Sequence, residues 1–256
     1  MTTETPPISE MTYLGGRRAF VTGGGKGIGL AIAARLVEAG AVVTIGDLDP
    51  ATEVAATAVG AAFQQCDITD SAQVAAAFDA VCGQTGSLQI LVNNAGIFPT
   101  TGPMLDATDN FVARMLDVNV RATFGAAREA ARRMTTGGAI VNIASIAGLS
   151  GGANISAYSA SKAAVIALTR AFAIELGPLG IRVNAIAPGI IDTPGVQQQL
   201  APLKASGVDV ERRIAANPLG IAGHADHVAR AALFLVSDLA AFVNGDVLVV
   251  DGGARA

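Results

Sequence analysis

The chain has 256 residues with a formal net charge of −4, and 51% of its residues are hydrophobic and 15% charged. This composition can bury a large core, which excludes an intrinsically disordered protein, and without a basic stripe it argues against a nucleic-acid partner. The start of the chain lacks the basic and apolar segments of a signal peptide, and no uninterrupted apolar run reaches membrane-spanning length, so we expect a cytoplasmic protein with no membrane partner.

The length fits one large α/β domain or two small ones, and the pattern below favours one. We expect residues 1–16 to form a flexible N-terminal arm and residues 17–256 to form the domain.

A glycine-rich turn joins the first predicted strand to the first predicted helix. Residues 17–22 are apolar, and G-G-G-K-G-I-G then leads into a helical pattern that ends at Gly40. Glycines allow the backbone to approach a ligand closely, and a helix N-terminus offers free N–H groups and partial positive charge to a pyrophosphate. The spacing Gly23-x-x-x-Gly27-x-Gly29 in this context indicates a dinucleotide site.

An aspartate ends the second predicted strand, residues 41–47. Asp47 lies eighteen residues after Gly29, where a carboxylate can accept hydrogen bonds from the adenosine ribose and would repel a 2′-phosphate. This favours NAD over NADP. Two alternatives stay open: Asp47 could serve only the turn before a helix that Asp49 caps, and Lys26 in the glycine turn could meet a 2′-phosphate.

Strands and helices then alternate along the chain. The further predicted strands are residues 61–66, 88–92, 138–145, 181–187 and 246–250, and the further predicted helices are residues 51–59, 70–82, 108–134, 157–176 and 226–237. This alternation predicts a parallel sheet covered by helices on both faces. Ligands of such sheets bind at the carboxyl ends of the strands, where the polar and glycine-rich segments of this chain fall: Gly23–Gly29, Asp47, Asp67, Asn93–Gly96, Ser145 and Pro188–Gly189.

A serine ends the predicted strand 138–145, and a tyrosine and a lysine follow it. Tyr158 and Lys162 are four residues apart, so on a helix they share one face. A phenol is normally protonated, with a pKa of about 10, and we expect the nearby ammonium to lower that pKa. Such a phenol can exchange a proton with an alcohol or a carbonyl. The alternative is a solvated pair, but the largely apolar helix around Lys162 makes a buried lysine costly unless function needs it.

The segment 190–217 interrupts the alternation with prolines and glycines, and we expect it to be a lid over the ligand edge. We expect no metal site. His224 and His227 lack a third ligand nearby and are better explained as surface or cap residues. Cys66 and Cys82 have no CxxC spacing and indicate reduced thiols.

These motifs, in this order, resemble the classical short-chain dehydrogenase/reductase family. The resemblance runs from about Arg17 to Gly253 through T-G-G-G-K-G-I-G, N-N-A-G, Asn119 in D-V-N-V, Ser145, Y-S-A-S-K and P-G-I-I-D-T. It implies a doubly wound Rossmann fold with a seven-stranded parallel sheet. It also implies a homotetramer or homodimer, and we favour a homotetramer formed through helices 108–134 and 157–176.

The resemblance also implies a role for individual residues. Tyr158 would be the general acid/base, Lys162 would lower its pKa and hold the nicotinamide ribose, Ser145 would bind the substrate oxygen, and Asn119 would hold a water beside Lys162. Residues implied to line the cofactor are Gly23, Lys26, Gly27, Ile28, Gly29, Asp47, Leu48, Asp67, Ile68, Asn93, Ala95, Gly96, Pro188, Gly189, Ile191 and Thr193. The Tyr-x-x-x-Lys spacing argues against the enoyl reductase branch, where the gap is longer.

The residues placed to line a substrate pocket are apolar, and they are Phe98, Ile146, Leu149, Ile155, Ile190, Val196 and Leu200. They favour a neutral, largely hydrophobic secondary alcohol or ketone, unless they are simply core. The sequence therefore predicts an NAD-dependent alcohol dehydrogenase or ketone reductase acting on a small molecule. The alternatives are an NADPH-dependent 3-ketoacyl or sugar reductase, and a non-catalytic nucleotide-binding scaffold on the same fold.

Overall fold

Seven parallel strands form the central sheet, in the order β3-β2-β1-β4-β5-β6-β9. The structure is a computed structural model that describes residues 6–83, 86–99, 102–205, 207 and 209–256. The strands are β1 Arg18–Thr22, β2 Val42–Asp47, β3 Ala62–Gln65, β4 Ile90–Asn93, β5 Gly138–Ile143, β6 Ile181–Pro188 and β9 Val247–Val250. The chain builds outward from β1 to β3 and then crosses to β4 on the other side of β1, so the strand order reverses between β1 and β4.

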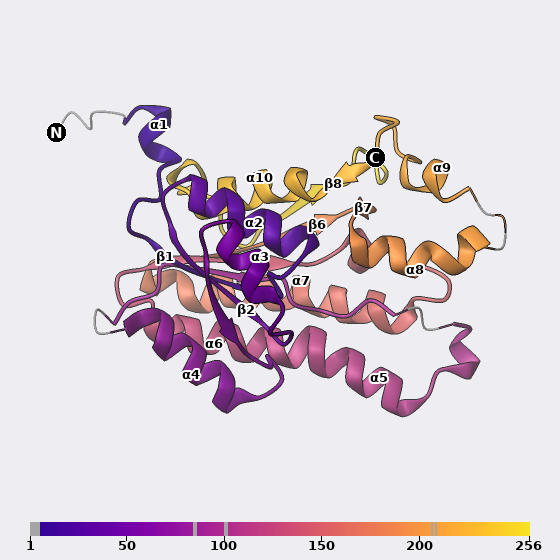
Figure 1. The fold of residues 1–256 in the computed structure, drawn as a ribbon, viewed down its shortest axis with the longest axis horizontal. Coiled ribbons are helices and arrows are strands. Elements are labelled where there is room, and N and C mark those ends of the chain that lie inside the picture. Colours follow the sequence, from indigo (N-terminus) through magenta and orange to yellow (C-terminus); the bar gives the residue numbers. More distant parts are fainter. Residues whose placement is uncertain (1–5, 84–85, 100–101, 206, 208) are drawn as a thin grey trace.

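Helices cover both faces of this sheet, as Figure 1 shows. Helices α2 (Gly27–Glu38) and α10 (Ala225–Val236) pack together on one face. On the other face lie α4 (Ser71–Cys82), α6 (Ala122–Arg133) and α7 (Ser156–Leu176). Helix α3 (Thr52–Ala58) joins β2 to β3, and α5 (Asp109–Leu116) precedes α6. The predicted single-domain, doubly wound fold is confirmed.

Side chains of the strands feed two separate cores because successive residues point to opposite faces. In β1, Ala19 and Val21 pack toward α2, whereas Phe20 packs toward α4. Phe20 meets Phe78 of α4 with ring centroids 4.9 Å apart, and both are fully buried. Burial on both faces explains why the strands read as continuous apolar runs in the sequence.

The helix predicted over 108–134 is not continuous. Helix α5 is followed by a π-helical turn, Asp117–Arg121, and only then by α6. A π turn holds one more residue than an α turn and often marks a functional site. Here it contains Asn119, which is buried. Helical spacing read along the sequence at 3.6 residues per turn does not reveal a single inserted residue.

The segment expected to be a lid leaves and rejoins the domain through a small ribbon. Strand β7 (Ile191–Asp192) pairs in parallel with β8 (Gly223–His224), and the segment between them contains α8 (Pro194–Ala205) and α9 (Val210–Ile214). Ser206 and Val208 lie outside the described residues. The closing motion of this segment stays a prediction.

A turn near residue 252 contacts both ends of that segment. A Cβ placed on Gly189 would lie 2.8 Å from Cβ of Asp251, and one on Gly252 would lie 2.5 Å from Oδ1 of Asn217. The Leu219 N–H donates to the Gly252 carbonyl at 3.3 Å. The Asp251–Gly253 turn therefore joins the two ends of the segment at the sheet edge.

Part of the expected N-terminal arm packs on the domain. Residues Ile8–Met11 form a one-turn helix, α1, and Leu14 is fully buried, with its N–H donating to the Ala39 carbonyl at 2.7 Å. Residues 1–5 lie outside the described residues. Across the chain described, no helix combines the length and apolarity needed to cross a bilayer.

We expect Phe78→Ala to lower the free energy of unfolding by about 3–5 kcal/mol, because it leaves a cavity against Phe20. Leu105→Ala is the control, since Leu105 is 90% exposed and its loss should change stability by less than about 0.5 kcal/mol. Urea unfolding followed by circular dichroism measures both. Equal effects of the two substitutions would contradict the described core.

Candidate active site

The polar residues singled out in the sequence meet at the carboxyl edge of the sheet. The glycine turn follows β1, Asn94 to Gly96 follow β4, Ser145 follows β5 and Gly189 follows β6. A Cβ on Gly96 would lie 3.0 Å from Asn119 Oδ1 and 3.5 Å from Lys162 Nζ, so the segment after β4 comes close to α7. The edge lies where the strand order reverses, which is the usual ligand position in such sheets.

Tyr158 is in the first turn of α7, and its phenol lies near the Ser145 hydroxyl, which acts to lower the pKa of the phenol. Ser145 precedes a 3-10 turn, Ile146–Gly148, and its Oγ accepts the Ala147 N–H at 3.1 Å. The 3-10 turn lies tightly on α7, because a Cβ on Gly148 would be 2.6 Å from the carbonyl carbon of Lys162. Backbone packing therefore brings the two hydroxyls together.

Lys162 lies one turn further along α7 and is buried, with 6% of its surface exposed. Its Nζ donates to the carbonyl oxygen of Ile143, the last residue of β5, at 2.8 Å, and lies 5.8 Å from the centre of the Tyr158 ring. Burial lowers the pKa of Lys162 to about 8, since taking a charge out of water disfavours the protonated form.

The pKa of Tyr158 differs from our expectation. We predicted that Lys162 lowers it, but burial of the phenol raises the pKa and only the Ser145 side chain opposes that rise. The reason is geometric, since the ammonium is directed to the Ile143 carbonyl. Sharing a helix face is therefore not enough to place the lysine charge at the phenol oxygen.

The amide of Asn119 is used by protein partners. Its Oδ1 accepts the Ile97 N–H at 2.8 Å, and its Nδ2 donates to the Ile97 carbonyl and to Ser161 Oγ, both at 3.0 Å. Asn119 thus links the π turn, the segment after β4 and helix α7. The water that the resemblance assigns to Asn119 stays a prediction.

The glycine turn is shaped for close approach of a ligand. Gly23 and Gly27 have φ of 62° and 58°, which L side chains rarely adopt. A Cβ on Gly29 would lie 2.4 Å from Asn94 Nδ2 and 2.5 Å from the Gly23 carbonyl oxygen. This turn opens onto the N-terminus of α2, so it fits a dinucleotide pyrophosphate.

Thr193 reaches this turn from the expected lid. A Cβ on Gly27 would lie 3.4 Å from the Thr193 side chain. Ile191, two residues earlier, is buried. These positions agree with the cofactor contacts expected for both residues, which stay predictions.

Asp47 has a structural role at the end of β2. Its Oδ2 accepts the Gly25 N–H at 3.0 Å and its Oδ1 accepts the Asp49 N–H at 3.2 Å. The carboxylate therefore supports the glycine turn, and it keeps lone pairs for ribose hydroxyls. Asp49, which we expected to be the N-cap of the next helix, is not the N-cap residue; that position is Ala51. Asp49 Oδ1 instead accepts a hydrogen bond from the Ala51 N–H at 2.9 Å.

The second aspartate expected at the cofactor is also hydrogen-bonded locally. Asp67 Oδ1 accepts both the N–H and the hydroxyl of Thr69, at 2.8 and 2.7 Å. Leu48, which follows β2, is 64% exposed, and Lys26 in the glycine turn is also exposed.

Two asparagines after β4 have separate tasks. Asn93 is buried and donates to Asn142 Oδ1 at 2.9 Å, while its own Oδ1 has no hydrogen-bond partner among the described residues. Asn94 donates to the carbonyls of Thr22 and Gly23, at 3.0 and 2.8 Å. Asn94 thus ties the segment after β4 to the glycine turn, a role missed in the sequence although the paired asparagines were its signal.

Comparison with known proteins agrees with this geometry. A family model described as enoyl-(acyl carrier protein) reductase matches residues 23–255. The chain is 40% identical to the cis-4-hydroxycyclohexanecarboxylate dehydrogenase of Sinomonas cyclohexanicum, over 94% of this chain and 97% of that one. It is 39% identical to the cyclopentanol dehydrogenase of Comamonas testosteroni, over 93% and 96%.

A solved structure, a short-chain type dehydrogenase/reductase from Mycobacterium ulcerans, is 36% identical with a TM-score of 0.87, covering 94% of this chain and 90% of that one. The chain belongs to the classical short-chain dehydrogenase/reductase family. It is therefore an oxidoreductase of a family that binds a nicotinamide cofactor.

The substrate residues expected from the short-chain dehydrogenase/reductase resemblance fall in three places. Phe98 contacts Tyr158, with ring centroids 4.2 Å apart. Ile146 and Ile155 lie between Ser145 and α7, and Ile190, Val196 and Leu200 lie in or next to the expected lid. Their contact with substrate stays a prediction.

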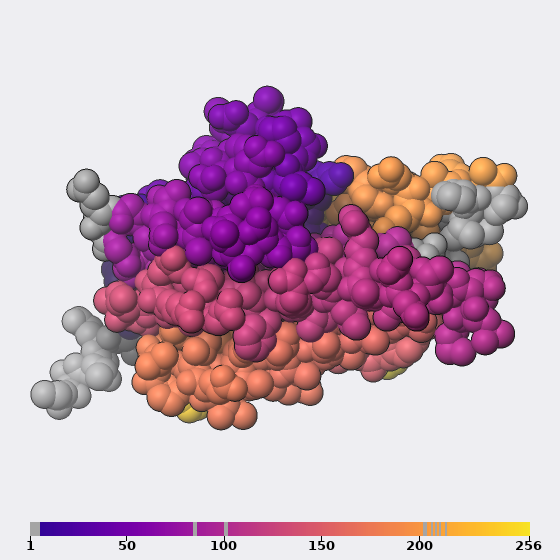
Figure 2. All heavy atoms as spheres, turned by 90° about the horizontal axis from the view of Figure 1, so that it is seen from below, coloured from indigo at the N-terminus to yellow at the C-terminus, as the bar shows by residue number. Residues whose placement is uncertain are grey.

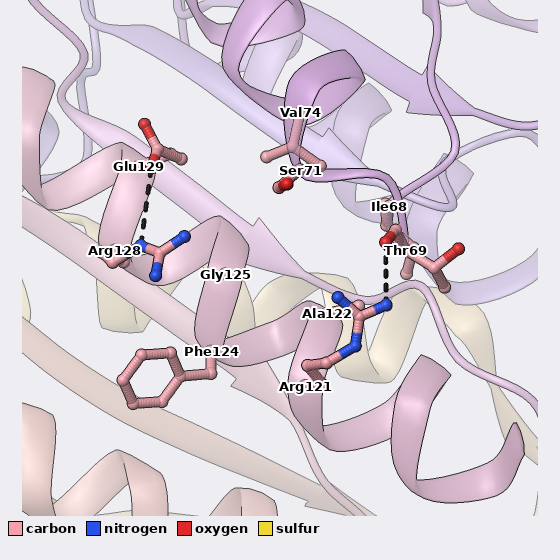
Figure 3. A pocket seen from close by; sticks show the side chains of 10 residues that line it. All are labelled: Ile68, Thr69, Ser71, Val74, Arg121, Ala122, Phe124, Gly125, Arg128 and Glu129. Carbon is pink, nitrogen blue, oxygen red and sulfur yellow. Dashed lines mark hydrogen bonds and ion pairs between the residues drawn. The ribbon is translucent and has the colours of Figure 1, made fainter. Parts of the chain in front are cut away.

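A separate hollow, whose lining residues do not include Tyr158, lies between α4 and α6 (Figure 3). Ile68 and Thr69 line one side, and Arg121 crosses to donate to the Thr69 carbonyl at 2.8 Å. Ile68, which we expected beside the cofactor, thus lines this hollow.

We expect Lys162→Met to raise the free energy of unfolding at pH 7 by about 3 kcal/mol, because the folded chain no longer has to keep a buried ammonium protonated. Below the folded pKa of about 8 the full cost is present. Between that value and the unfolded pKa of about 10.4 the folded lysine is neutral and the wild-type chain regains stability, so the difference should shrink by pH 10. Urea unfolding at the two pH values measures it.

The exposed Lys26 offers a matched control, and Lys26→Met should change stability by less than about 0.5 kcal/mol. The same gain for Lys162→Met at pH 7 and pH 10 would contradict the burial argument.

Proposed function

We propose that the chain is an NAD(H)-dependent oxidoreductase that interconverts a secondary alcohol and a ketone, with a neutral, largely hydrophobic substrate. The observation that carries this proposal is the Ser145 hydroxyl close to the Tyr158 phenol, beside the buried ammonium of Lys162. Two neighbouring hydroxyls suit a single substrate oxygen.

In this mechanism Tyr158 is the general acid/base. When an alcohol is oxidised, the Tyr158 oxygen accepts the proton of the substrate hydroxyl, while Ser145 holds that hydroxyl in place. In the reverse direction Tyr158 donates the proton to the carbonyl oxygen. The nicotinamide, when bound, supplies or accepts the hydride.

The proposed mechanism needs a positive charge near the phenol. The pKa of Tyr158 is raised by burial, and the phenolate formed during oxidation would be stabilised by a cation. The Lys162 ammonium lies 5.8 Å from the ring centre but donates to the Ile143 carbonyl, so it would have to turn toward the phenol oxygen to supply that charge.

Asp47 supports the preference for NAD. A carboxylate at the end of β2 can bind ribose hydroxyls and repels a 2′-phosphate. Lys26 is the residue that would favour NADP, but it is exposed. An NADPH-dependent 3-ketoacyl or sugar reductase is therefore the second candidate, and a non-catalytic scaffold is the third.

The substrate class is supported by the apolar residues around the site and by two relatives whose names state cyclic alcohols. One is named for cyclopentanol, which is neutral, and the other for cis-4-hydroxycyclohexanecarboxylate, which is a cyclic alcohol that also carries a charged carboxylate. The residues predicted to line the substrate pocket include no basic side chain that could bind a carboxylate, so a neutral cyclic alcohol is the proposed substrate.

We also propose that the chain works in the cytoplasm as a homotetramer, through helices 108–134 and 157–176. Figure 2 shows α6 between α4 and α7 on one open face. An apolar hollow on this face is lined by Ala113, Leu116, Asp117, Val120, Arg121, Phe124 and Leu168, and Phe124 is 43% exposed. A second copy would cover these side chains.

We expect Tyr158→Phe to lower turnover at least about a hundredfold, because the proton acceptor is lost. Affinity for NADH should stay nearly unchanged, which titration calorimetry checks. The assay is a panel of cyclic and open-chain secondary alcohols with NAD, read by formation of the reduced cofactor. Wild-type-like turnover by the variant would refute the mechanism, and no turnover of any alcohol by the wild-type chain would favour the scaffold.

We expect Asp47→Ser to shift the preference from NADH toward NADPH, because it removes the charge that repels a 2′-phosphate but keeps an oxygen for the Gly25 N–H. The ratio of the two dissociation constants, measured side by side, should change about tenfold or more, as for the loss of a nearby charge. Tighter binding of NADPH by the wild-type chain would overturn the preference.

A further inference from the structure

One aromatic ring lies directly against the proposed acid/base. The ring centroids of Phe98 and Tyr158 are 4.2 Å apart, with an angle of 48° between the planes. Phe98 comes from the segment after β4, and Tyr158 from the first turn of α7. Phe98 and Tyr158 are both half-buried, and each ring covers part of the other.

The backbone that carries Phe98 is fixed by Asn119. The Ile97 N–H donates to Asn119 Oδ1 at 2.8 Å, and the Ile97 carbonyl accepts from Asn119 Nδ2 at 3.0 Å. Both backbone polar groups of the residue before Phe98 are therefore held by one amide. Such a paired contact leaves little freedom for the segment to move away from α7.

The same amide also holds the helix that carries Tyr158. Asn119 Nδ2 donates to Ser161 Oγ at 3.0 Å, and Ser161 Oγ donates to the Tyr158 carbonyl at 2.7 Å. The two rings are thus placed by one buried side chain, 1% exposed. Their contact follows from this hydrogen-bond arrangement as well as from the apolar character of the rings.

A phenyl ring offers the Tyr158 oxygen no hydrogen bond and excludes water from the surface that it covers. On its polar side the phenol is near the Ser145 hydroxyl. Keeping the phenol toward Ser145 holds it where a substrate oxygen must arrive, and orientation of this kind contributes strongly to rate.

We propose that Phe98 is a positioning residue that shields Tyr158 from water and holds its hydroxyl toward Ser145, and that Asn119 fixes Phe98 through Ile97. The kinetic part of this proposal rests on the proposed function, but the shielding of Tyr158 can be measured without any turnover.

The composition of the chain makes that measurement direct. There are two tyrosines and no tryptophan, and Tyr13 is 64% exposed. In a Tyr13→Phe background, ultraviolet-excited fluorescence therefore comes from Tyr158. Quenching of this fluorescence by acrylamide at neutral pH reports how far the ring is open to solvent.

In that background we expect Phe98→Ala to raise the quenching constant severalfold, and Phe98→Leu, which keeps apolar bulk, to raise it less. Phe242→Ala is the matched control, because Phe242 is fully exposed. Circular dichroism checks folding, and if Phe98→Ala does not fold, Phe98→Leu carries the test.

With a secondary alcohol as substrate, Phe98→Ala should lower kcat/KM about tenfold and move the pH profile of kcat/KM down by about one unit, since exposure to water lowers the pKa of a buried phenol. A change in KM alone, with an unmoved pH profile, would show that Phe98 only lines the substrate pocket and would overturn the proposal.

Unchanged quenching in Phe98→Ala would overturn it independently. If no alcohol is turned over by the wild-type chain, yet quenching rises in the variant, the proposed function fails and the shielding role of Phe98 stands.

Discussion

The ammonium of Lys162 is the constraint on which the site depends. It is buried at the end of the central strand β5 and donates to the Ile143 carbonyl. An unpaired buried charge is costly, so the surrounding structure has to accept that cost and keep the lysine in one position. Helix α7, the 3-10 turn at Ile146 and the segment around Gly96 all pack against this point, so they share one rigid frame.

Much of the frame could be predicted because its signals are local. The glycine turn, the strand ends and the spacing of Tyr158 and Lys162 are visible in the sequence and fall at one sheet edge in the structure. Positive φ at Gly23 and Gly27 is a property that glycine alone announces. The alternation of strands and helices was enough to predict a sheet covered by helices on both faces, since both faces of the central strands are buried.

Features that depend on contacts between distant residues could not be predicted. The π turn around Asn119 interrupts the helical segment, and spacing read along the sequence at 3.6 residues per turn does not reveal it. Burial raises the pKa of Tyr158, and the Lys162 ammonium is directed to the Ile143 carbonyl instead of the phenol, which helical spacing does not encode. Asn94 and Asp47 likewise have bonds to the glycine turn that only the assembled sheet edge brings into reach.

The Asp251–Gly253 turn has a consequence for how the protein matures. This turn contacts Gly189 and Asn217 at the two ends of the segment between β6 and β8, and β9 just before it completes the sheet beside β6. During translation, residues 190–217 leave the ribosome before β9 and the Asp251–Gly253 turn have been synthesised. The nascent chain can therefore assemble the glycine turn and the Tyr158 site early, but that segment can settle only after β9 and its turn have emerged.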